Sequence, residues 1–344
     1  MANSPTKLKG CGCSGRQPVF LLGDTAVPFR IFAALGVVLA LSSTALAQFG
    51  PKEEAPTGGS RLDKGLTKRW QVGVRVRAVG GSVGPLMGTI PVPTDWPEQQ
   101  VKVVAEDVTP HVGSITYRVI DGGVKQMVFN IPQIPPNDLA KALITFEVTK
   151  HSQLAPTETT GYVIAKNPPK EYRKFLGPSP MIEIANAKIK SLTKELVTGK
   201  EGAWAQVESL CDGVREKVKL DKDKIKGAQA ALRDGKADQE DLTALFVACC
   251  RIHKVPARMV WIPDSCYAEF YLEDAKGKGF WFPCQVAGDK AFGAQPDQRP
   301  ILQKGDNFKV PEKKESMRFV NEFLTGKGGG GSPEVEFVRR LEEK

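Results

Sequence analysis

The sequence predicts an α+β protein in which an N-terminal antiparallel β-sandwich is followed by a domain that packs helices against a second antiparallel sheet. From Trp70 to about residue 148, short runs alternate apolar and polar residues and show no helical periodicity. Residues 238–255 then place apolar side chains at helical spacing, and strand patterns follow within residues 258–284. Strands followed by helices and further strands are typical of this fold class.

The first strand of the sandwich has the clearest pattern. Its apolar side chains alternate with polar or small ones, so that one face carries Trp70, Val72, Val74 and Val76. Further short strands are expected at residues 88–92, 101–105, 114–120, 124–130 and 142–148. Asp121-Gly122-Gly123 is a hairpin signal between two of them. Roughly six short strands in about a hundred residues predict a sandwich over residues 66–166.

The helix after residue 237 has marked ends. Its apolar residues recur every three or four positions, at Leu242, Leu245, Phe246 and Cys249. Asp238 stands where an N-cap belongs, and Pro256 prevents the helix from continuing past Val255. We therefore expect a buried helix that begins next to residue 239.

Two helices are expected before this one and three strands after it. Apolar residues at helical spacing within residues 182–196 and 204–218 predict the helices. Turn formers separate strand patterns at residues 258–262, 267–272 and 280–284. The second domain should therefore cover residues 181–312, after a Pro-rich linker at residues 167–180.

Four short motifs surround the expected helix and strands. They read GKADQED at residues 235–241, VPAR at 255–258, SCYAEFY at 265–271 and WFPCQ at 281–285. In this frame the sequence resembles the bacterial transglutaminase-like family of papain-like thiol enzymes. The family motifs read roughly Gly-x-Gly-Asp-Cys-Glu-Asp, Ile-Pro-Ala-Arg, His-x-Trp-x-Glu-x-Tyr and Trp-x-Pro-x-Asp. The resemblance covers about residues 180–290 and, more weakly, the preceding sandwich.

The resemblance implies a Cys/His/Asp triad whose three positions hold Gln239, Ser265 and Gln285 in this chain. The family's chemistry needs a thiolate activated by a helix N-terminus and an imidazole, and neither group is present at these positions. We therefore expect a catalytically inactive member that binds a polypeptide or a cell-envelope component. Its groove would be lined by Gln239, Trp261, Ser265, Tyr267 and Gln285.

Two other functions stay open. The chain could be an active transamidase or peptidase with an unrecognised nucleophile, or a hydrolase that uses Ser265. Either needs a histidine in reach, and the chain offers His111, His151 and His253. His253 lies at the far end of the helix, on the order of 20 Å from Gln239. A purely structural role of the sandwich is the third alternative.

Cys266 and Cys284 flank two of the triad positions. If Ser265 faces Gln285 across an antiparallel pair, these two cysteines also face each other, and a disulfide could form in an oxidising compartment. The alternative is a pair of thiols in the core. The other cysteines of this domain suit the core as small apolar residues.

The N-terminus has the three parts of an export signal. Residues 1–47 combine a basic start, an apolar run at 31–41 and the cleavage pattern Ala45-Leu46-Ala47. The apolar run is too short to span a membrane, although a buried helix or an uncleaved anchor stays open. We expect an exported protein, periplasmic or extracellular, without a membrane span after cleavage, and a disordered lead-in at residues 48–65.

The remaining features limit the function further. The net charge is +9, but the cations are not clustered with aromatics as a nucleic-acid surface requires. We find no phosphate loop and no metal-ligand spacing, so we expect no cofactor. The tail at residues 313–344 is expected to contain a Gly-rich linker and a short helix from Pro333.

Overall fold

The computed structural model describes residues 58–222, 224–326 and 329–342. It shows helices together with antiparallel sheets, which confirms the predicted α+β class. Among these residues, no helix has the length and apolarity needed to cross a membrane. The export signal expected at residues 1–47 lies outside the described residues. The disordered lead-in was expected to reach residue 65, but β1 begins at Arg61. Residues 48–57 of that lead-in lie outside the described residues.

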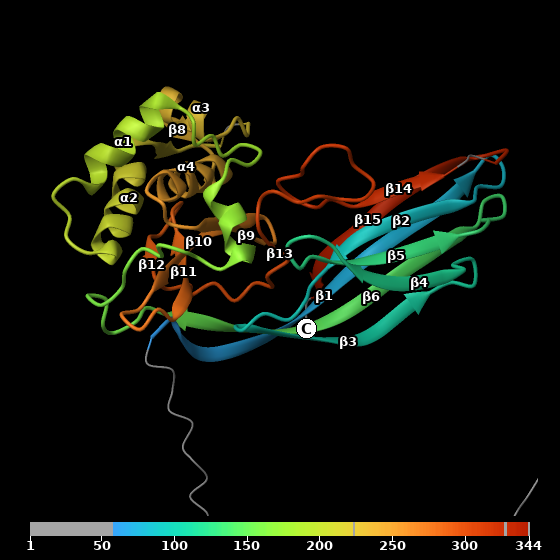
Figure 1. The fold of residues 1–344 in the computed structure, drawn as a ribbon. Coiled ribbons are helices and arrows are strands. Elements are labelled where there is room, and N and C mark those ends of the chain that lie inside the picture. The colour runs from blue at the N-terminus through green and yellow to red at the C-terminus, as the bar shows by residue number, and fades with distance from the viewer. Residues whose placement is uncertain (1–57, 223, 327–328, 343–344) are drawn as a thin grey trace, which may run out of the picture. The chain divides into compact units, whose positions relative to one another are not determined.

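Two four-stranded sheets form the sandwich (Figure 1). The first has the order β15 (Ser332–Glu342), β1 (Arg61–Val79), β6 (Leu139–Leu154), β3 (Gln99–Val108). The second has the order β14 (Phe323–Gly326), β2 (Leu86–Val92), β5 (Lys125–Ile131), β4 (Ser114–Val119). Alternate residues of both sheets point inward, and Trp70, Phe129 and Phe146 belong to the buried core between them.

The C-terminal end corrects one prediction. Residues 333–344 were expected to form a helix, but Ser332–Glu342 is the strand β15, which pairs antiparallel with β1. The open edge of β1 offers a row of backbone partners that a helix could not use, and this outweighs the local helical spacing. The glycines before β15 permit the approach, since a Cβ on Gly331 would lie 2.3 Å from the carbonyl oxygen of Gly81.

The helical part packs around a third, five-stranded sheet (Figure 1). The helices are η1 (Lys170–Leu176), α1 (Ala187–Val197), α2 (Ala203–Lys217), α3 (Ala228–Asp234) and α4 (Gln239–Ile252). The sheet has the order β12 (Ala291–Phe292), β11 (Gly279–Gln285), β10 (Ser265–Glu273), β9 (Ala257–Ile262), β13 (Gln303–Lys304). The short strands β7 (Lys219–Leu220) and β8 (Lys236–Ala237) pair in parallel. The segment expected as a linker thus contains η1.

Helix α4 positions the site. Its N-cap is Asp238, whose carboxylate accepts a hydrogen bond from the Asp241 amide at 2.9 Å. The helix contacts β9 and β10 on one side and the other α-helices on the other, so Leu245 and Phe246 are fully buried. The first residue of α4 is Gln239, the residue that the sequence resemblance aligns with the family's nucleophile.

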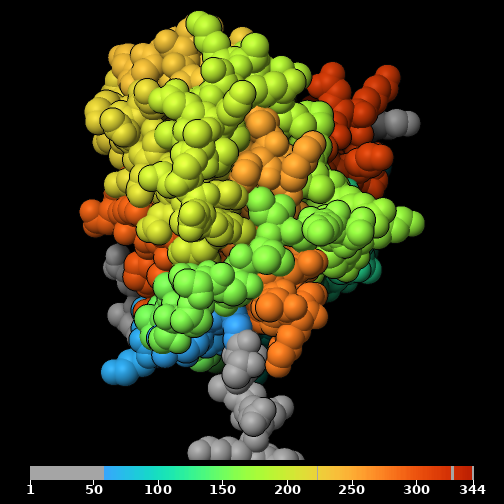
Figure 2. Space-filling model, turned by 60° about the vertical axis from the view of Figure 1, so that its left-hand side comes forward, coloured from blue at the N-terminus to red at the C-terminus, as the bar shows by residue number. Residues whose placement is uncertain are grey.

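On another face of the molecule, three segments from distant parts of the sequence lie side by side (Figure 2). They are the start of the described chain near Gly58, residues 156–162 and residues 274–276, and they line a cavity of about 560 Å³. The amide of Gly59 donates a hydrogen bond to the Tyr162 hydroxyl at 3.1 Å. This cavity lies outside the region of the predicted triad.

Candidate functional site

Gln239 and Ser265 meet at the N-terminus of α4. The Ser265 hydroxyl donates to Gln239 Oε1 at 3.1 Å, and Gln239 Nε2 donates to the carbonyl of Asp264 at 3.0 Å. Asp264 has a positive φ of 57°, which forms the tight turn that brings the start of β10 to the helix. Two of the three expected triad positions are therefore in direct contact, through neutral groups that hold each other.

Gln285 does not join this pair. Its Nε2 donates to the carbonyl of Ala287 at 2.9 Å, and its Oε1 accepts from Gln295 at 3.4 Å. The register explains this, because β10 pairs with β11 so that Ala268 is opposite Cys284. The expected register, with Ser265 opposite Gln285, is wrong by two residues.

The same register bears on the possible disulfide. Cys266 is not opposite Cys284, and both are free cysteines. The Cys284 thiol lies 3.5 Å from the Cys211 sulfur, whereas Cys266 Sγ lies 3.7 Å from the Thr243 hydroxyl. The alternative of two thiols in the core is what the structure shows.

The cysteines of the described residues are poor nucleophiles. Cys211, Cys249, Cys250, Cys266 and Cys284 are all fully buried. Burial raises the pKa of Cys249 to about 11 and that of Cys266 to about 12. Burial also raises the pKa of Cys250 and of Cys284 well above the ordinary range. Thiols with such pKa values stay protonated at neutral pH, and the thiolate is the reactive form.

The three histidines are engaged elsewhere. His253 Nε2 lies 2.8 Å from Gln206 Oε1, at the C-terminal end of α4. His111 pairs with Asp138, and His151 Nδ1 lies 2.8 Å from the carbonyl of Asp63. Neither Gln239 nor Ser265 has a histidine among its hydrogen-bond partners.

A groove of about 890 Å³ opens beside Gln239 and Ser265. Of the residues expected to line it, Gln239, Trp261 and Ser265 do so. Tyr267 does not, because it is fully buried in a separate apolar cluster. Gln285 does not line it either, because the pairing of β10 with β11 is shifted by two residues from the expected register.

The sequence did not predict the wall of the groove that the sandwich and the C-terminal segment provide. Its main residues are Trp70, Met317, Arg318, Phe319, Arg339 and Arg340. The wall depends on β15 pairing with β1, which the expected C-terminal helix precluded. The local signal was Arg318-Phe319, a cation beside an aromatic ring directly after the polar stretch at residues 312–316.

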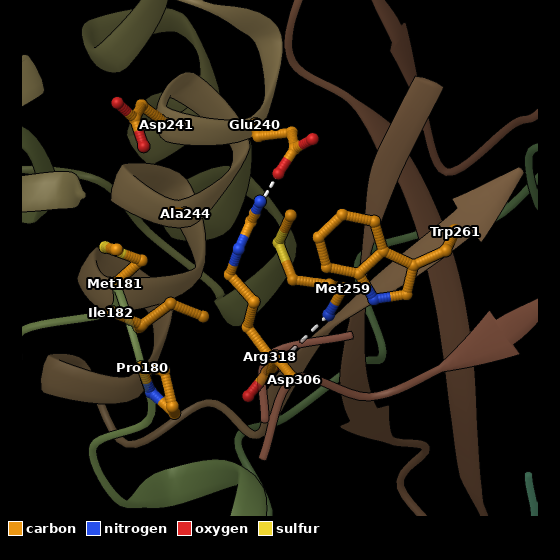
Figure 3. A pocket seen from close by; sticks show the side chains of 10 residues that line it. All are labelled: Pro180, Met181, Ile182, Glu240, Asp241, Ala244, Met259, Trp261, Asp306 and Arg318. Atoms are coloured by element: carbon orange, nitrogen blue, oxygen red, sulfur yellow. Dashed lines mark hydrogen bonds and ion pairs between the residues drawn. The ribbon is translucent and has the colours of Figure 1, made fainter. Parts of the chain in front are cut away.

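Arg318 and Phe319 contact the triad region directly. The Arg318 guanidinium pairs with Glu240, the residue after Gln239 (Figure 3). It also lies over the Trp261 ring, 5.5 Å from the centroid, and Phe319 packs edge-on against that ring at 5.2 Å. Nearby, Arg339 pairs with Glu322 at 3.1 Å. Arginine carboxylate pairs therefore hold the C-terminal wall in place.

Comparison with known proteins finds a matching family model and similar solved structures. Residues 190–286 match the family model of the transglutaminase-like superfamily. A solved structure named a putative cysteine protease, from Cytophaga hutchinsonii, superposes with a TM-score of 0.52 at 14% identity and covers 83% of this chain and 94% of that one. A putative protease from Parabacteroides distasonis gives a TM-score of 0.26 at 12% identity, covering 67% and 48%. No curated protein sequence matches.

Proposed function

The chain carries a transglutaminase-like domain at residues 190–286, and we propose that it is a catalytically inactive member that binds a polypeptide in the groove beside Gln239. The observation that carries the proposal is the Gln239–Ser265 hydrogen bond at 3.1 Å. The two positions that would hold a thiolate and an imidazole hold instead an amide and a hydroxyl that pair with each other. Neither group supplies a nucleophile and its base at neutral pH.

The cysteines and histidines support the same function. A transamidase or peptidase with a different nucleophile needs a reactive thiol or hydroxyl next to a base. The described thiols are fully buried, and Ser265 donates its hydroxyl to an amide oxygen that is not basic. No contact in the described part of the chain favours the enzyme alternative.

The groove suits a polypeptide. Its lining combines neutral hydrogen-bonding groups such as Gln239, Ser265 and Asn321 with the aromatic rings of Trp261 and Phe319. Amide and hydroxyl groups can satisfy the backbone of an extended chain, and aromatic rings accommodate its side chains. Export to the periplasm or the extracellular space belongs to the same proposal, and its support is the N-terminal signal pattern. A cell-envelope component would then be the natural source of the polypeptide.

Restoring the missing chemistry tests the loss of catalysis. We expect the natural chain to show no amine incorporation and no peptide hydrolysis. The variant Gln239→Cys/Ser265→His should gain activity, or trap a glutamine-mimicking electrophile at position 239, at least about tenfold above Gln239→Cys alone. Turnover by the natural chain would overturn the proposal.

A binding experiment tests the second part of the proposal, that the groove binds a polypeptide. A phage-displayed random peptide library is selected on the full chain and counter-selected on Ser265→Trp, whose indole would fill the groove. Enriched peptides should bind the natural chain and lose at least about tenfold in affinity on the Trp variant. Peptides that bind both proteins equally would place recognition outside the groove.

A further inference from the structure

A narrow slot opens from the groove at the N-terminus of α4. Its free volume is about 10 Å³, enough for a single water molecule, because a side chain already fills it. That side chain is Arg318, which runs through the centre of the slot and meets Glu240 at its end (Figure 3). The pair is mostly shielded from solvent, with side-chain exposures of 28% for Arg318 and 23% for Glu240.

The walls of the slot fit the stem of a long side chain. Met181 and Ile182 lie on one side of Arg318, and Met259 and Trp261 lie on the other (Figure 3). Methionine side chains adapt to the shape of an occupant, and the methylene groups of an arginine are apolar. The walls therefore hold the stem while its charged end stays free to pair.

The end of the slot fits a cation. Glu240 supplies a carboxylate, and the Trp261 ring lies 5.5 Å from the guanidinium carbon of Arg318. A planar guanidinium can pair with a carboxylate and stack on an indole at the same time. Asp241 also borders the slot, but its carboxylate accepts amide hydrogen bonds from Lys226 and Gly227 and turns away.

The occupant comes from a segment outside the helices and strands, although Gln303 of β13 holds the neighbouring Val320 by two hydrogen bonds of 2.8 Å. Residues 305–322 join β13 to β14 without helix or strand, apart from a bridge between Phe308 and Met317. Beside Arg318, Phe319 contacts the Trp261 ring at 5.2 Å. Glu240, Trp261 and Arg318 line the groove as well as the slot, so a ligand in the groove can reach the slot once Arg318 leaves.

We propose that the slot is a subsite for an arginine side chain of a bound polypeptide, and that Arg318 occupies it in cis when no ligand is present. Because the slot shares Glu240, Trp261 and Arg318 with the groove, this subsite rests on the proposed binding function. The chain's own arginine then competes with the ligand at the high effective concentration of a tethered group. The groove would favour polypeptides whose arginine displaces it.

Removing Arg318 tests the subsite. The probe is Nα-acetyl-L-arginine methylamide, titrated calorimetrically into the full chain and into Arg318→Ala. We expect Arg318→Ala to bind the probe at least about tenfold more tightly than the natural chain, because the internal competitor is gone. The citrulline analogue of the probe, which has the same shape without the charge, should not bind.

Two further variants serve as controls. Arg318→Ala/Glu240→Gln should lose the binding, because the carboxylate that pairs with the probe is gone. Arg233→Ala removes an exposed arginine of α3 that lines neither the groove nor the slot, so it should behave as the natural chain does. Equal binding of the arginine and citrulline probes by Arg318→Ala, or no binding by the folded variant, overturns the proposal.

If Arg318→Ala fails to fold, Arg318→Ser also removes the stem from the slot and leaves the carboxylate of Glu240 free. The arginine probe should then raise the melting temperature of Arg318→Ser and the citrulline probe should not; equal shifts, or none, also overturn the proposal. These outcomes are distinct from those for the proposed function. Catalysis by the natural chain would refute the proposed inactivity but would not refute an arginine subsite shown by these titrations. A slot that binds no arginine probe would refute the subsite but not the proposed inactive groove.

Discussion

Gln239 is held by two hydrogen bonds of its side-chain amide, one to the carbonyl of Asp264 and one from Ser265. These contacts tie the first turn of α4 to the turn before β10. The amide therefore acts as a structural link at the proposed position of the family's reactive group. Such a link is useful to a binding groove, because it fixes the wall without adding reactivity.

The contribution of this link to the free energy of unfolding can be measured. Gln239→Ala removes both hydrogen bonds at a site that is partly exposed, so we expect the free energy of unfolding to fall by about 1 kcal/mol. Ser265→Ala removes only one of them and should cost less. Urea denaturation of both variants provides the comparison. A loss above about 3 kcal/mol for Gln239→Ala would mean that the pair supports more of the core than its two bonds indicate.

At the scale of single elements, local signals decide which predictions hold. Helix α4 is predicted because Asp238 and Pro256 mark its ends within the sequence itself. Strand β15 is not, because its partner is distant: Arg75 and Glu336 pair across 261 residues. The spacing of Val335, Val338 and Leu341 fits a helix, and only the open edge of β1 turns the segment into a strand.

Two substitutions distinguish the strand from the predicted helix. On a helix, Val335 and Val338 would share one face, whereas on β15 they point to opposite faces, with exposures of 38% and 5%. Val338→Asp would bury an unpaired carboxylate, so we expect it to lower the free energy of unfolding by about 2–4 kcal/mol. Val335→Asp should change it by less than about 1 kcal/mol. Equal losses in thermal unfolding would contradict the strand.

At the scale of the whole molecule, the sequence predicts only part of the candidate site. The motifs predict that Gln239 and Ser265 lie close together, and the two are hydrogen-bonded because both belong to the local frame around α4 and β10. They cannot place Arg318, whose contact with Glu240 depends on how the C-terminal segment crosses the domain. They also misplace Gln285 and Cys284, because a shift of two residues keeps the apolar face of β11 unchanged and leaves no trace in the sequence pattern.

A buried ion network joins the sandwich to the second domain. Lys304 Nζ lies 2.6 Å from the carboxylates of both Glu98 and Glu269, and Arg258 pairs with Glu269 at 2.7 Å. Glu98 comes from the sandwich, whereas Glu269 is on β10. All but Arg258 are at most 3% exposed at the side chain. Removing one partner would leave buried charges without compensation, which costs about 3–5 kcal/mol.

The network predicts how stability depends on pH. Burial alone would raise the pKa of Glu269. The neighbouring cations Lys304 and Arg258 lower it by a larger amount, so that the pKa falls from 4.5 to about 2. The folded protein therefore holds this carboxylate ionised in a range where the unfolded chain binds a proton. The stabilisation is fully present above pH 4.5 and is lost as the pH falls from about 4.5 to about 2, by an amount on the order of 3 kcal/mol.

Urea unfolding between pH 6 and pH 2.5 measures this loss of stability. Glu269→Gln should be less stable at neutral pH and lose part of the acid slope, whereas Glu315→Gln, an exposed glutamate, should keep the natural slope. An unchanged slope in Glu269→Gln would mean that other carboxylates cause the acid sensitivity.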